Sequence, residues 1–186
     1  AIAGLMAITT TNPTFEWEGA QRLIVGNRDE LQVSGAIGGP IIDDVLAFRL
    51  SADWQRRDSF LDLEDFPEAE NSERFSLETY RGKLLVTPSD RVSSLLTFSY
   101  QNVREPQTLV VRRPFEDQIT AFANNPVFKN EVLVGVIDTK IKLADSVTLE
   151  LLGSVSDFTV NRFAPASEGN AEVDGFEYVL EPLVRF

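Results

Sequence analysis

Residues 46–55, LAFRLSADWQ, decide the fold class of this chain. Every second side chain from Leu46 to Trp54 is apolar, whereas the side chains between them, Arg49 and Asp53 included, are small or polar. Successive side chains of a β-strand point to opposite faces, so this segment predicts a strand with one apolar and one polar face. A helix would instead repeat its apolar positions roughly every 3.6 residues.

The same alternation recurs in about eight segments, which are separated by clusters of Gly, Pro, Asp and Ser. We therefore predict an all-β chain of about eight antiparallel strands in up-and-down order. The apolar positions of the other segments are Phe15, Trp17, Leu23 and Val25; Leu31, Val33, Gly35 and Ile37; Tyr80, Leu84 and Val86; Leu96, Phe98 and Tyr100; Leu133, Ile137, Ile141 and Leu143; Val147, Leu149, Leu151 and Val155; and Leu180, Val184 and Phe186.

The connections alternate in length. The predicted tight turns are residues 39–44, 88–91 and 144–146. The predicted long, polar connections are residues 58–73, 103–130 and 162–174, with residues 26–29 the one short connection on that side. Brief turns at one end and long loops at the other are typical of outer-membrane barrels. Several alternating runs reach roughly 10 residues, the length that crosses a bilayer at a tilt.

Charge placement agrees with a membrane-spanning strand. No base falls at the central apolar position of any predicted strand, where an Arg or Lys would cost about 2–4 kcal/mol at the lipid midplane. We therefore predict an antiparallel transmembrane β-barrel in the bacterial outer membrane, with its apolar face toward lipid. Trp17, Trp54, Phe98 and Tyr100 are candidates for the aromatic girdles.

Composition removes whole classes of function. The chain lacks His and Cys, which excludes Cys/His zinc sites and His-dependent catalytic triads. Its net charge of -12 argues against a nucleic-acid partner. No run approaches the roughly 20 apolar residues of a transmembrane helix, and no signal segment precedes the first motif. Because the chain starts at Ala1, we expect it to be an excised or processed part of a longer protein.

Residues 1–13, AIAGLMAITTTNP, resemble the end of the plug domain in TonB-dependent transporters, where a pattern near AIGGAINIVTKNP leads into the barrel. The matching positions are Ala1, Ile2, Gly4, Ile8, Thr10, Asn12 and Pro13. Leu5, Met6, Ala7 and Thr9 depart from it, and the asparagine expected near position 7 is missing.

Two later stretches are also similar to this family. Residues 26–60 contain the GN-D turn, the G-GP strand end and the Arg-rich approach to Phe60 that are typical of its first hairpins. Residues 81–100 look like its next turn, with RGKLL followed by a P-D corner. The resemblance covers residues 1–100 in sequence and the remainder in pattern alone.

The resemblance implies two parts: residues 1–13 as the end of a plug, and residues 14–186 as the N-terminal strands of a barrel of roughly 22 strands. It further implies a receptor that imports a scarce nutrient such as a ferric siderophore. The partners implied are outer-membrane lipid, the plug and the remaining strands of the same protein, and the TonB complex through a missing N-terminal part. The identity of the ligand does not follow.

Two alternatives stay open. In the first, the strands close on themselves as a small eight-stranded outer-membrane barrel. Pro182 argues against this alternative, because a proline within the last strand removes a hydrogen-bond donor from the ladder. Otherwise the chain is a soluble sandwich or barrel that binds a ligand, with the apolar face inside.

Transport of this kind needs no catalytic group and no cofactor, and no sequence motif places a Ser beside a base, so we predict a non-enzyme. Arg112, Arg113 and Phe115 are candidates for binding an anionic ligand; the alternative is that the two arginines pair with the acidic connection 58–73. That connection does not have EF-hand spacing, and no metal site is predicted. The charges expected to face the lumen, where most of them satisfy one another, are Arg49, Asp53, Arg81, Lys83, Lys140 and Arg185.

Overall fold

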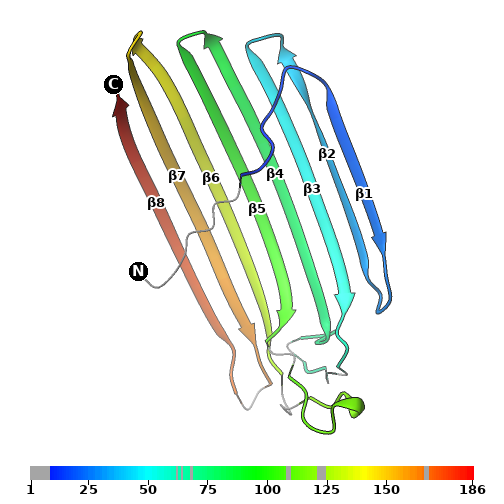
Figure 1. Ribbon diagram of the computed structural model, residues 1–186. Helices are drawn as coiled ribbons and strands as arrows, with labels where there is room; N and C mark the ends of the chain where they lie inside the picture. Colours follow the sequence, from blue (N-terminus) through cyan, green and yellow to red (C-terminus); the bar gives the residue numbers. More distant parts are fainter. Residues whose placement is uncertain are drawn as a thin grey trace.

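The computed structural model describes residues 9–61, 63, 65–67, 69–107, 110–120, 125–165 and 168–186. Eight strands form one antiparallel sheet in sequence order, so the predicted all-β, up-and-down arrangement is confirmed (Figure 1). The strands are β1 (Glu18–Val25), β2 (Leu31–Ile42), β3 (Leu46–Asp58), β4 (Arg74–Ser89), β5 (Val92–Pro106), β6 (Val127–Ala144), β7 (Val147–Phe163) and β8 (Ala171–Arg185). The helix found within the described residues is one 3-10 turn, η1 (Phe115–Asp117), and none there is long and apolar enough to span a membrane.

The connections alternate between the two ends of the sheet, as Figure 1 shows. Short turns join β2 to β3, β4 to β5 and β6 to β7 at one end, which we call the turn side. The other end, the loop side, carries the connections β3–β4, β5–β6 and β7–β8 together with the shorter β1–β2 turn.

Several predicted boundaries were wrong. β5 extends to Pro106 and β6 begins at Val127, so the predicted loop 103–130 is shorter than expected, as is the loop 162–174. Near their loop-side ends these strands carry polar side chains on both faces, and strands without an apolar face resemble loops in sequence. On the turn side, β2 continues through Pro40 to Ile42, with a register shift beside Pro40.

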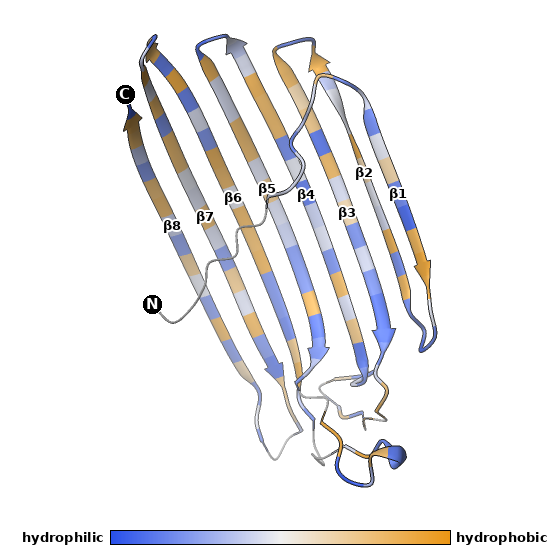
Figure 2. Cartoon of the chain, viewed as in Figure 1, coloured by the Kyte–Doolittle hydropathy of each residue, from blue (hydrophilic) through white to orange (hydrophobic). Residues whose placement is uncertain are grey.

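The register separates the side chains into two faces. Phe48 of β3 pairs with Leu84 of β4, and Arg49 pairs with Lys83. Paired residues lie on the same face and neighbours in sequence on opposite faces. We call the face with Phe48 the apolar face and the face with Arg49 the polar face; Figure 2 shows the alternation along the strands.

The apolar face is an oblique band. On β1 and β2 it continues toward the loop side as far as Val25 and Leu31, and Leu31 pairs with Arg56 of β3. On β3 to β7 it stops one or more paired rows nearer the turn side, whereas on β8 it reaches Phe176, opposite Asp157, one row back toward the loop side. The last apolar or aromatic residues before polar ones are Trp54 on β3, Tyr80 on β4, Tyr100 on β5, Leu133 on β6 and Val155 on β7.

The sheet is a single open layer. Among the described residues, the buried hydrophobic side chains are Ala47, Leu61, Ala69, Val127 and Ala164, and no second layer covers the apolar face. Leu50 is 53% exposed and Phe98 is 56% exposed. Each described strand contacts only its sequence neighbours, so β1 and β8 are free edges and the sheet is not closed.

Prolines occupy positions where a missing N–H does little harm. Pro40 and Pro88 lie at irregularities in the register of β2 and β4, and Pro182 lies opposite Leu151 on the edge strand β8. Bulges and edge strands are the places where sheets tolerate proline. Pro182 therefore does not prevent β8 from pairing with β7.

Candidate functional site

The predicted lumen charges all lie on the polar face, but only some of them come together. Arg49 pairs with Lys83 across β3 and β4; Arg81 lies two residues from Lys83, and Asp53 lies four residues from Arg49. Lys140 and Arg185 lie apart from them on β6 and β8. The sequence therefore predicted that these charges share one face of the sheet. Which of them lie close together depends on the strand register.

Three of these charges have partners on the sheet itself. The Arg49 guanidinium forms an ion pair with Glu18 at 3.0 Å, joining β3 to the start of β1. The Gln32 amide donates to the Asp53 carboxylate at 3.0 Å. Further along the sheet, Arg185 pairs with Glu150 at 3.0 Å. These contacts account for Arg49, Asp53 and Arg185, whereas the hydrogen-bond partners of Lys83 are uncharged oxygens.

Lys83 binds the segment that precedes the first strand. Its ammonium donates to the backbone oxygen of Thr10 at 2.9 Å and to the side-chain oxygen of Asn12 at 2.8 Å. Lys83 is 6% exposed, so this segment covers it. Of the predicted plug end, residues 9–13 therefore lie on the polar face, while residues 1–8 lie outside the described residues.

A cleft of about 340 Å³ opens at the loop side of the polar face. Two guanidinium–aromatic contacts form part of its wall: Arg28 lies 6.0 Å from the centre of the Phe60 ring, and Arg57 lies 5.1 Å from that of Phe75. Arg28 also donates to the backbone oxygen of Ser59 at 2.9 Å. A cation over an aromatic ring is a common element of ligand sites. The sequence analysis missed this cleft, although the run RRDSF in residues 56–60 was a signal for it.

The carboxylates Glu30, Glu73 and Glu105 also line this cleft. It therefore presents both signs of charge, which suits a ligand with cationic and anionic groups more than a simple anion. Within the part of the chain that the structure describes, no group of three side chains is arranged to hold a metal ion.

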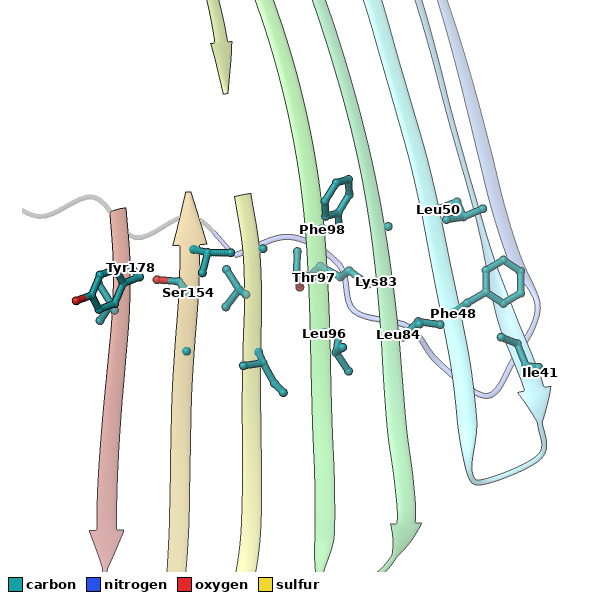
Figure 3. A pocket seen from close by; sticks show the side chains of 17 residues that line it. Ile41, Phe48, Leu50, Lys83, Leu84, Leu96, Thr97, Phe98, Ser154 and Tyr178 are labelled. Carbon is teal, nitrogen blue, oxygen red and sulfur yellow. The ribbon is translucent and has the colours of Figure 1, made fainter. Parts of the chain in front are cut away.

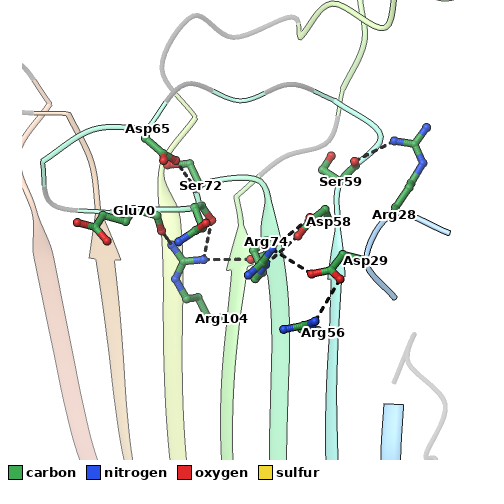
Figure 4. A network of polar contacts seen from close by, with 11 residues as sticks. Arg28, Asp29, Arg56, Asp58, Ser59, Asp65, Glu70, Ser72, Arg74 and Arg104 are labelled. Atoms are coloured by element: carbon green, nitrogen blue, oxygen red, sulfur yellow. Dashed lines mark hydrogen bonds and ion pairs between the residues drawn. The ribbon is translucent and has the colours of Figure 1, made fainter. Parts of the chain in front are cut away.

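A polar network organises the loop side of the apolar face (Figure 4). Arg74 binds Asp58 at 2.8 Å and Asp29 at 3.3 Å, and Arg56 binds Asp29 at 3.1 Å. These contacts join the β1–β2 turn to the ends of β3 and β4. Such a network occupies the region directly beyond the oblique apolar band.

Arg104 extends the network to the β3–β4 connection. Its guanidinium donates to the backbone oxygens of Glu70, Asn71 and Arg74. Within the connection, the backbone N–H of Ser72 donates to Asp65 at 2.7 Å. Backbone donation from Ser72, and then from Asn71, lowers the pKa of the Asp65 carboxyl from its ordinary value. Asp62, Glu64 and Glu68 of the predicted acidic run lie outside the described residues.

The predicted ligand residues Arg112, Arg113 and Phe115 lie in the β5–β6 connection, away from the cleft. Arg113 lies 5.7 Å from the centre of the Phe115 ring, and all three side chains are exposed. The backbone N–H of Arg112 donates to Ile119 at 3.1 Å. Among the described residues, neither arginine forms an ion pair with the acidic connection.

The apolar face carries a shallow groove of about 870 Å³ (Figure 3). Gly82, Gly135 and Gly153 form its floor, and larger side chains such as Leu50, Phe98 and Leu96 form its rims. Each glycine pairs with a large residue on a neighbouring strand: Gly82 and Gly135 with Phe98, and Gly153 with Ile137. The face is therefore apolar throughout the groove but not smooth.

These features describe a wall with two chemically different faces and a cleft at one end. No protein-family model matches the chain, and no solved structure gives a significant match to it.

Proposed function

We propose that this chain forms part of the barrel wall of a TonB-dependent outer-membrane receptor that takes up a scarce nutrient, most simply a ferric siderophore. The observation that carries the proposal is a single-layer sheet whose apolar face is uncovered and whose polar face binds the segment before the first strand. In such a receptor the apolar face contacts lipid, and residues 9–13 continue into a plug within the barrel.

The oblique course of the apolar band supports a membrane barrel. Barrel strands tilt by about 35–45° from the barrel axis, and paired rows run perpendicular to the strands. A band parallel to the membrane plane must therefore cross the paired rows at an angle. The shift from Leu31 on β2 to Val155 on β7 follows this expectation.

The same face argues against a soluble binding module. In a soluble barrel or sandwich, Phe48 and Leu50 would pack inside a closed core. Here Leu50 is half exposed, and the sheet lacks a covering layer within the described residues. Solvating such a face would be costly, because each buried CH₂ group is worth about 0.8 kcal/mol.

Lipid contact can be tested on one pair of neighbouring residues. Leu133 and Val134 are adjacent apolar residues of β6 that lie on the apolar and polar faces. The chain has no native cysteine, so Leu133→Cys and Val134→Cys each accept a single fluorophore. We expect spin-labelled lipids to quench the label at position 133 and not at 134. Equal quenching at both positions would exclude a lipid-facing sheet.

The transport function needs a separate test. A native strain that lacks the gene should grow poorly when the scarce nutrient, iron supplied as a ferric siderophore, is limiting. Re-introducing the gene should restore growth only when TonB is intact. Restoration without TonB would refute the receptor proposal and leave the lipid-contact result unaffected.

The behaviour of the two free edges tests whether the chain is part of a larger barrel or a complete small barrel. An open edge in hydrocarbon leaves backbone groups unsatisfied, at several kcal/mol each. We expect the isolated 186-residue chain in detergent to form heterogeneous oligomers through β1 and β8, as measured by light scattering. A monodisperse, heat-resistant monomer would favour the self-contained barrel.

A further inference from the structure

A small polar pocket lies where the segment before β1 crosses the polar face. It has a volume of about 280 Å³ and lies between Thr9–Thr11 on one side and β3 and β4 on the other. Arg49, Arg81 and Lys83 all contribute to its wall, together with Ser51. Arg49 and Lys83 are paired across the strands, and Ser51 is paired with Arg81, so the three bases point to the same side of the sheet.

The charges of this pocket are not balanced. Glu18 neutralises Arg49. Lys83 is almost fully buried, yet its two acceptors, on Thr10 and Asn12, are uncharged. Arg81 forms no ion pair or hydrogen bond with any other described residue. Within the described residues, two positive charges thus remain without a counter-ion, although the net charge of the protein is -12.

Lys83 and Arg81 also have N–H donors that no described acceptor uses. A lysine ammonium has three N–H donors, and Lys83 uses two of them. A guanidinium has five, and those of Arg81 are unused within the described residues. A buried charge is costly unless it is paired, whereas a fork of guanidinium donors matches the oxygens of a carboxylate or phosphate.

We propose that this pocket binds one oxyanion, a carboxylate or a phosphate group, between Arg81 and Lys83. Thr9–Thr11 form the opposite wall, so the bound anion lies between the strands and the preceding segment. The group belongs either to a small solute or to a carboxylate side chain from elsewhere in the protein's interior. The site is distinct from the loop-side cleft and does not depend on the transport proposal.

Equilibrium dialysis of the 186-residue chain in detergent, with labelled inorganic phosphate and with acetate as a competitor, tests the proposal. The pocket lies on β3 and β4, away from the edges β1 and β8 through which we expect the chain to form oligomers, so binding is counted per chain. We expect one phosphate per chain, displaced by acetate. Arg81→Gln should weaken binding at least about tenfold because it removes a charge-assisted donor. Arg81→Lys keeps the charge and should retain part of the affinity.

Arg22→Gln is the matched control, because Arg22 lies on the same face of β1 outside this pocket. It should leave binding unchanged. Absence of saturable binding to the wild-type chain, or equal losses in Arg81→Gln and Arg22→Gln, would overturn the proposal. Circular dichroism of each variant checks that the sheet has formed.

Phosphate binding by the protein purified from its native membrane, compared with binding by the 186-residue chain, identifies the source of the anion. If that protein and the 186-residue chain both bind labelled phosphate, the anion is a solute. If only the 186-residue chain binds it, a carboxylate of the native protein already fills the pocket.

Discussion

Two regions of the same face have opposite chemistry. In the apolar band, Leu50 and Phe98 project from the sheet without polar partners. Six residues further toward the loop side, Arg56 and Arg104 occupy the same face of the same strands and bind carboxylates or backbone oxygens. The backbone is continuous through both regions, so the change lies in the side chains alone. Under the proposed function, the band would contact hydrocarbon and the network would contact water.

The largest expected effect comes from placing a charge in the band. Leu96→Arg, one row further from the border than Phe98, should destabilise the protein in lipid vesicles by about 2–4 kcal/mol, the cost of a base near the midplane. Asn102→Arg, on the same face of β5 beyond the band, should cost about 0–1 kcal/mol. Urea unfolding in vesicles measures both, and equal costs would remove the distinction between the two regions.

A smaller effect should follow from loosening the network. Arg104→Lys replaces a planar fork that reaches three backbone oxygens with a single ammonium, at a cost of about 1–2 kcal/mol. The change should increase hydrogen exchange at Ser72 and leave the amides of the band protected. Arg113→Lys, in an exposed loop outside the network, is the control. Exchange that increased equally throughout the sheet would show that the two regions are not independent.

The border between the regions contains a single polar contact that can be removed. The hydroxyl of Tyr100 donates to Glu131 at 2.9 Å, and its ring stacks on Tyr80 at 6.4 Å between ring centres. Tyr100→Phe keeps the stacking and should cost about 1 kcal/mol in the same unfolding experiment. Tyr80→Phe should cost less, since the Tyr80 hydroxyl donates to no other described residue. The opposite order would contradict the assigned border.

The smallest effect is a local dependence on pH. Because backbone donors lower the pKa of Asp65 in the folded protein, the contact contributes stability above the ordinary pKa of an aspartate. This contribution is lost as the pH falls through the lowered value. Protection of the Ser72 amide should therefore decrease in acid, and Asp65→Asn should remove that dependence. A wild-type amide whose protection did not change with pH would refute it.

The sequence predicted the strands and their faces because period-two alternation is a local signal. It placed Arg49, Asp53 and Lys83 on the polar face without knowledge of the register. It did not predict the network, because Arg104 binds backbone oxygens, which leave no signature in the side-chain pattern. The contact of Lys83 with Thr10 was missed for the same reason, and its contact with the Asn12 side chain joins residues 71 positions apart in the sequence.

The ligand prediction had a different weakness. Arg112, Arg113 and Phe115 form a recognisable cation–aromatic group in sequence, but they lie in an exposed connection and do not line the loop-side cleft. The cleft instead combines Arg28 and Arg57 with aromatic residues of other segments. Residues that meet only through strand pairing cannot be recognised as a group from a single sequence.

The neighbour-to-neighbour order of the sheet has a consequence for how such a protein changes in evolution. Each described strand contacts only the strands beside it in sequence, so a hairpin is a unit that shares one boundary with each neighbour. Duplicating or deleting one hairpin would leave every other pairing intact and keep all later strands in the same orientation. A wall built in this way can change its circumference in steps of two strands, while the contacts within each remaining hairpin stay the same.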